Sequence, residues 1–233
     1  MLPPVAILAG GLSTRMYPVT RTIPKALLEV AGEPFITHQL RLLKSKGISG
    51  VVLCVGNMGD LIEKFVGDGS AYGLSVRYSY DGEKLLGTGG AIKKALPKLG
   101  NEFFIMYGDS YLTADLAEID EGYRKSGKPA MMAVFRNKNL WDTSNVIFRE
   151  GKVIKYDKLE RSPEMEYIDY GLAIIKAECF SGVREGEVSE LADIYKELAA
   201  GGKLAGCEVS ERFYEIGSFT GLEELNTVLG GKK

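Results

Sequence analysis

Short apolar runs alternate with amphipathic stretches along the first half of the chain. The apolar runs predict buried strands at residues 5–8, 51–55, 76–80 and 103–107. Between them, helical periodicity predicts helices at residues 34–46, 61–66 and 90–99. Near-continuous apolar strands separated by helices are typical of a parallel sheet that is covered on both faces. The pattern therefore predicts an α/β fold with a mostly parallel sheet.

The pattern changes after about residue 129, where β-like runs are joined by short polar turns. These runs lie at residues 131–135, 145–149, 153–156 and 168–175. Their short connections predict antiparallel strands added to the sheet rather than another βαβ unit. Helical patterns return at residues 189–200 and 221–229. We expect one α/β domain over residues 1–233, in which the later strands form the second wall of a pocket.

Composition and charge exclude several classes of protein. The 29 basic and 31 acidic residues give a net charge of −2, which argues against nucleic-acid binding through bulk positive charge. No apolar run approaches the ~20 residues that cross a bilayer, and no basic segment precedes the first apolar run as in a secretion signal. Three widely spaced cysteines suit a reducing compartment, and a single histidine argues against structural zinc. We expect a cytoplasmic protein with no nucleic-acid or membrane partner.

The loop after the first strand carries the clearest chemistry. It reads Leu8-Ala9-Gly10-Gly11-Leu12-Ser13-Thr14-Arg15-Met16, and Pro24-Lys25 follows it. Ligands bind beyond the carboxyl ends of parallel strands, where glycine backbone amides can hold phosphate oxygens. Arg15 offers a planar fork for bidentate phosphate binding, and Lys25 offers a mobile point charge. Phosphate binding is the prediction, and an ordinary tight turn with two solvated cations is the alternative.

The glycine spacing excludes two familiar nucleotide-binding motifs. A Walker loop requires G-x-x-x-x-G-K-[ST] and a dinucleotide-binding turn requires G-x-G-x-x-G, and the first loop has neither. The sequence is therefore not that of a P-loop ATPase or a nicotinamide-dependent oxidoreductase. The single histidine, His38, lies away from the motifs, so a Ser-His-Asp hydrolase cannot be assembled.

The first loop is part of a longer pattern, L-A-G-G-x-x-T-R-M-x-P-x-T followed by P-K-A-L-L-E-V-A-G-E-P. Further matching runs lie at residues 67–70, 86–91 and 108–110. Together they resemble the signature of the sugar-1-phosphate nucleotidylyltransferases, also called NDP-sugar pyrophosphorylases, from Ile7 to about Leu225. The short length and the L-G-T-G-G-A run are most similar to single-domain heptose- or mannose-1-phosphate guanylyltransferases, with a short N-acetylmuramate 1-phosphate uridylyltransferase also close. The resemblance implies a Rossmann-like sheet of the nucleotide-diphospho-sugar transferase type.

The resemblance also implies a reaction. Enzymes of this family transfer an NMP group from an NTP to a sugar 1-phosphate or a related phosphate, with Mg2+, and release pyrophosphate. Arg15 would hold the pyrophosphate, Lys25 would stabilise the α-phosphate, and Asp109 would bind the metal. Asp109 is otherwise an Asx-turn residue. The family's second metal-binding aspartate is replaced by Glu215, for which a surface position or binding through water are the alternatives.

The implied binding residues divide between two halves, a nucleotide-binding half of about residues 1–129 and an acceptor-binding half of about residues 130–220. The nucleotide would lie against Leu8, Ala9, Gly10, Gly11, Ser13, Thr14, Gly87 and Thr88. Most of these contacts would be made by backbone groups, so no side chain indicates which base is bound. Asp81 and Glu83 could accept from a guanine amino group, although loop acids are more often solvated.

The acceptor side departs from the family pattern. Relatives carry Y-G-V, E-K and N-A-G runs, which here become S-N-V, D-K and D-Y-G. The matching acceptor-binding candidates are Asn145, Asp157, Lys158, Asp169 and Gly171. Trp141 could stack on a sugar ring or simply pack. The acceptor, the base and assembly into a homo-oligomer stay open, and a catalytically silent relative that binds nucleotides is the alternative function.

Overall fold

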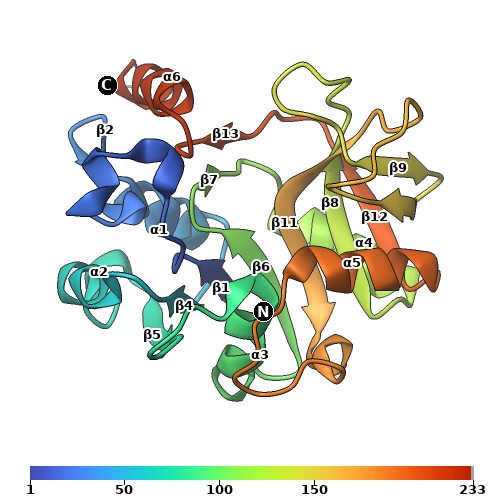
Figure 1. The fold of residues 1–233 in the computed structure, drawn as a ribbon, viewed down its shortest axis with the longest axis horizontal. Coiled ribbons are helices and arrows are strands. Elements are labelled where there is room, and N and C mark those ends of the chain that lie inside the picture. Colours follow the sequence, from blue (N-terminus) through green and yellow to red (C-terminus); the bar gives the residue numbers. More distant parts are fainter. Residues whose placement is uncertain (232–233) are drawn as a thin grey trace.

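The computed structural model describes residues 1–231, which fold around one nine-stranded sheet (Figure 1). In spatial order the strands are β5 (Ser75–Tyr80), β4 (Gly50–Val55), β1 (Val5–Leu8), β6 (Glu102–Tyr107), β11 (Ile168–Lys176), β8 (Ala130–Phe135), β12 (Leu204–Val209), β10 (Lys152–Tyr156) and β9 (Val146–Arg149). The first four run parallel to one another. The predicted α/β fold with a mixed, mostly parallel sheet is confirmed.

Helices cover both faces of the sheet, as the apolar strands predict. Along β1, Val5 and Ile7 face one hydrophobic core and Ala6 faces the other, because successive side chains of a strand point to opposite faces. Three helices pack on the first core and two on the second. The first three are α1 (Phe35–Ser45), α2 (Gly59–Val66) and α4 (Leu116–Ser126), and the other two are α3 (Gly87–Leu99) and α5 (Leu191–Ala200).

The four antiparallel strands predicted in the second half are confirmed, and the structure adds a fifth strand, β12, that the sequence pattern did not predict. Strand β11 is antiparallel to β6 and β8, and β10 is antiparallel to β9. Strand β12 instead runs parallel to β8. A Cβ at Gly206 of β12 would lie 2.5 Å from the Phe148 ring, so packing requires the glycine that weakens the strand pattern.

A small third core joins the C-terminal end of the described chain to the first loop region. Helix α6 (Phe219–Gly230) places Leu225 against Val30 and Phe35 in this core, and Figure 1 shows α6 beside β2. Two short two-stranded sheets lie here: the hairpin β2 (Glu29–Val30) with β3 (Glu33–Pro34), and β13 (Tyr214–Glu215) with the distant β7 (Ser110–Tyr111). The second of these sheets places Glu215 beside the loop after β6.

Short 3-10 helices complete the described chain: η1 (Thr14–Met16), η2 (Val19–Arg21), η3 (Lys25–Leu27), η4 (Ser70–Tyr72) and η5 (Ala177–Phe180). Arg15 lies in η1 and Lys25 begins η3. Among residues 1–231, no helix is long and apolar enough to span a bilayer.

Candidate active site

The first loop folds closely over the ends of β1 and β4. A Cβ at Gly10 would lie 2.8 Å from the amide nitrogen of Gly56, so only glycine allows this approach. Ser13 adopts a left-handed conformation with φ 53, and its carbonyl accepts from the Thr20 hydroxyl at 2.9 Å. These contacts fix the loop that leads into Arg15.

A cavity of about 590 Å³ lies beneath this loop, beyond the carboxyl ends of β1 and β6. Its size is in the usual range for small-molecule sites. The structure brings together in its lining every predicted nucleotide-binding and catalytic residue: Leu8, Ala9, Gly10, Gly11, Ser13, Thr14, Arg15, Lys25, Gly87, Thr88 and Asp109. Residues far apart in the sequence therefore share one site.

An ion pair crosses the cavity. Lys25 Nζ lies 2.9 Å from Asp109 Oδ2, and the two side chains are 15% and 29% exposed. Asp109 lies two residues after the end of β6. Gly108 between them allows the strand end to approach β1, because a Cβ there would overlap the carbonyl oxygen of Leu8. Both charges are thus held at the floor of the site and remain partly open to a ligand.

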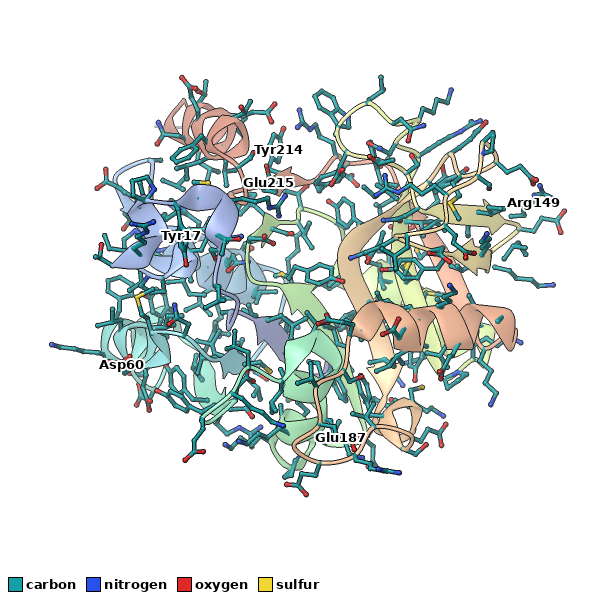
Figure 2. All side chains as sticks on the ribbon, in the orientation of Figure 1. Tyr17, Asp60, Arg149, Glu187, Tyr214 and Glu215 are labelled. Atoms are coloured by element: carbon teal, nitrogen blue, oxygen red, sulfur yellow. The ribbon has the colours of Figure 1, made fainter. Side chains whose placement is uncertain are left out.

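Glu215 lies beside this ion pair. The antiparallel pairing of Glu215 in β13 with Ser110 in β7 sets its position, and Figure 2 shows it on the segment that leads into α6. Its carboxylate accepts from the Ser218 hydroxyl at 2.6 Å and from the Gly217 amide. A Cβ at Gly217 would lie 2.6 Å from a Glu215 oxygen and 3.2 Å from both Asp109 Oδ2 and an Arg15 nitrogen. The two carboxylates and Arg15 therefore converge on one point.

The segment of residues 186–190, before α5, packs against the N-terminal turn of α3 and closes the cavity on a second side. The carbonyl of Ser189 accepts from the amides of Gly89 and Gly90 at 2.8 and 3.1 Å, and its amide donates to Leu86. Thr88 Oγ1 donates to Glu190 Oε2 at 2.7 Å. The first amides of α3 are therefore already capped by protein oxygens.

We expect Gly90→Ala to destabilise the fold by about 1–3 kcal/mol, the usual cost of overpacking. A Cβ at Gly90 would lie 2.5 Å from the carbonyl oxygen of Glu187, and this clash should outweigh the better helix propensity of alanine. Denaturant unfolding would measure the change. Gly182→Ala is the matched control, because nothing lies within 4 Å of its Cβ, and an equal effect of both variants would contradict the prediction.

Two of the predicted acceptor residues hold the scaffold together. Asn145 is buried, and its Oδ1 accepts from the Asp169 amide at 3.0 Å. Asp157 accepts from two amides in the turn that follows it and pairs with Lys196 at 2.6 Å. The hydrogen bond from Lys196 is the main reason that the pKa of Asp157 is lowered. Neither residue lines the cavity.

The other three acceptor candidates gather around Tyr107, which lines the cavity. Lys158 Nζ lies 5.1 Å above the Tyr107 ring, and Gly171 adopts φ +88 beside the same ring. Burial raises the pKa of Asp169, whose carboxylate accepts from the Gly171 amide at 2.9 Å. Lys158 is thus an exposed cation next to the cavity.

Two further predicted contacts turn out differently. Asp81 is buried and lines the cavity, so the expectation that this loop acid is solvated is wrong, whereas Glu83 is exposed. The half-exposed Trp141 stacks on the Arg212 guanidinium at 3.5 Å, and Arg212 also pairs with Glu224 at 2.7 Å. Glu190 also lines the cavity, although it belongs to none of the sequence motifs.

The position of this charged cavity, beyond the carboxyl ends of parallel strands, defines an α/β protein built to bind phosphorylated ligands. The sequence model of the nucleotidyl transferase family matches residues 5–144. The chain belongs to this family and is a nucleotidyltransferase.

Known relatives agree with this membership. N-acetylmuramate alpha-1-phosphate uridylyltransferase of Neisseria meningitidis serogroup B is 31% identical over 232 residues, with 97% of this chain and 98% of that protein covered. D-glycero-alpha-D-manno-heptose 1-phosphate guanylyltransferase of Campylobacter jejuni is 27% identical, with 91% and 93% covered. The crystal structure of a Bacillus anthracis protein in complex with a sucrose superposes with a TM-score of 0.87 at 23% identity, covering 100% and 97% of the two chains. This last likeness confirms the fold.

Proposed function

We propose that the protein transfers an NMP group from an NTP to a sugar 1-phosphate or a related phosphorylated metabolite, with Mg2+ as cofactor. A phosphate oxygen of the acceptor attacks the α-phosphorus, the bond from that phosphorus to the β-phosphate oxygen breaks, and pyrophosphate leaves. The convergence of Arg15, Lys25 and Asp109 in the lining of one cavity, with Glu215 beside Asp109, carries the proposal. Such a transfer needs chiefly charge neutralisation and positioning.

The three cationic side chains would each bind a different phosphate group. Arg15 supplies a planar fork to the leaving pyrophosphate, and Lys25 supplies its charge to the α-phosphate, where negative charge must be stabilised in the transition state. Lys158, beside Tyr107, is placed to bind the acceptor phosphate. Asn145, Asp157, Asp169 and Gly171 shape the acceptor side through the hydrogen bonds described above.

The donor set at Asp109 and Glu215 fits Mg2+. This ion binds through one or two carboxylates together with substrate phosphates and water. Asp109 and Glu215, which converge at Gly217, would be the protein's ligands and would leave the other positions to substrate and water. Bound there, the metal would neutralise phosphate charge.

A pyrophosphate-release assay tests the proposal. Four NTPs are crossed with a panel of sugar 1-phosphates and non-sugar phosphates, with and without Mg2+. We expect release for one NTP and a narrow set of acceptors, and only with the metal. Silence across the panel, with an NTP still raising the melting temperature, would overturn the proposed reaction and favour a catalytically silent nucleotide-binding protein.

A further inference from the structure

The cavity has two regions of opposite charge. Arg15 and Lys25 lie on the side of Glu215 and α6, whereas Asp81 and Glu190 lie at the start of α3. Figure 2 labels Glu215 on one side of the molecule and Glu187, from the segment that carries Glu190, on the opposite side. A ligand with one anionic end therefore has a defined orientation in this cavity.

The triphosphate of a nucleotide belongs at the cationic region. Asp81 and Glu190 would repel phosphate, and the α3 amides that could bind it already donate to Ser189. The base must then lie by the two carboxylates. Leu85 and Val188 line the cavity there and offer apolar surface for the faces of a base.

Each carboxylate is held by a hydrogen bond through one oxygen, Oδ2 of Asp81 and Oε2 of Glu190. Asp81 Oδ2 accepts from the Leu86 amide at 3.2 Å, while Lys94 donates to the Asp81 backbone carbonyl rather than to the carboxylate. Glu190 Oε2 accepts from Thr88, and its Oε1 lies 2.7 Å from the position of a Cβ at Gly87. Because an ionised carboxylate only accepts hydrogen bonds, this region selects for a base edge that donates.

We propose that the base is guanine, and that Asp81 and Glu190 determine this specificity; the inference rests on the nucleotidyl transfer proposed above. Guanine presents the adjacent donors N1–H and N2–H2. Uracil and thymine present one N–H between two carbonyl oxygens, and adenine and cytosine present an amino group next to an acceptor nitrogen. A carboxylate beside any of those acceptors is left unpaired or is repelled, and this is most costly at Asp81, which is buried.

Equilibrium binding without acceptor tests the proposal. Calorimetric titrations compare GTP with ITP, UTP, dTTP, CTP and ATP. We expect GTP to bind about tenfold or more tightly than the others, because each hydrogen bond to a charged group has about that effect. ITP is the sharpest comparison, since it lacks only the N2 amino group.

Two conservative variants complete the test. Asp81→Asn and Glu190→Gln keep an oxygen for Leu86 and Thr88, so folding is preserved, yet each should weaken GTP binding about tenfold and leave UTP binding nearly unchanged. Glu187→Gln, an exposed neighbour paired with Arg184, is the matched control and should change neither. Another NTP binding as tightly as GTP would overturn the assignment of guanine, and GTP binding that survives both variants would overturn the role of Asp81 and Glu190; neither outcome would touch the nucleotidyl transfer. Failure of every NTP to bind would overturn the nucleotidyl transfer itself.

Discussion

Asp109→Asn should lower the turnover number about a thousandfold or more, with the fold intact. Loss of a charged metal ligand removes several kcal/mol of transition-state stabilisation, and each 1.4 kcal/mol corresponds to about a factor of ten. The asparagine oxygen can still accept from Lys25, which lies 2.9 Å from the carboxylate, so the local packing is retained. Steady-state pyrophosphate release at saturating NTP and acceptor measures the effect.

A carboxylate outside the site provides the control for this variant. Asp115 caps α4 by accepting from the amide of Ala117 at 2.8 Å, and asparagine is an equally good cap. Asp115→Asn should therefore leave turnover and the melting temperature unchanged. If Asp109→Asn retained turnover within tenfold of the unaltered protein, Asp109 would not be the metal ligand.

Local patterns predicted the residues that form the charged floor of the cavity. The loop from Leu8 to Arg15 follows a short apolar strand, and Asp109 follows another. Carboxyl ends of parallel strands meet at the same edge of a sheet, so two such loops could be placed together before any contact was known. Strands β1, β4 and β6 were predictable because each is apolar on both faces, whereas the edge strand β5 alternates buried and exposed residues.

Elements with weak periodicity were not predictable. Helix α4 buries Leu116, Ile119 and Tyr123, but Gly122 interrupts its pattern, and Gly206 does the same in β12. In both cases the side chain that packs against the glycine, Met131 for Gly122 and Phe148 for Gly206, lies elsewhere in the chain. Tertiary packing therefore determines the secondary structure of these segments, as it commonly does where the local hydrophobic periodicity is weak.

The contacts of Glu190 and Glu215 depend on residues distant in sequence or on exact loop geometry. Glu190 meets Thr88 across 102 residues of chain, and no short motif encodes that meeting. Glu215 is one methylene longer than the family's aspartate, and its carboxylate is turned back onto Gly217 and Ser218. Sequence could identify the carboxylate at residue 215, whereas its position beside Asp109 required the fold.

Lys25→Met should lower the turnover number about a hundredfold to a thousandfold, the usual effect of removing one preorganised donor from developing charge. Methionine preserves the length of the side chain and removes the ammonium group. Lys93→Met is the matched control, because Lys93 is also partly buried and donates to a single oxygen, the Phe180 carbonyl at 3.0 Å. The control should retain full turnover, and comparable losses in both variants would contradict a catalytic role for Lys25.

A second readout of Lys25→Met should change in the opposite direction. Without nucleotide, the Lys25 ammonium occupies the Asp109 oxygen that a metal would need. Its removal should therefore tighten Mg2+ binding to the nucleotide-free protein, because a competing positive charge is lost. Titration of Mg2+ against the melting temperature measures this. Lower turnover together with tighter metal binding cannot come from a general loss of structure. Unchanged metal binding would show that Lys25 does not compete with the metal for Asp109.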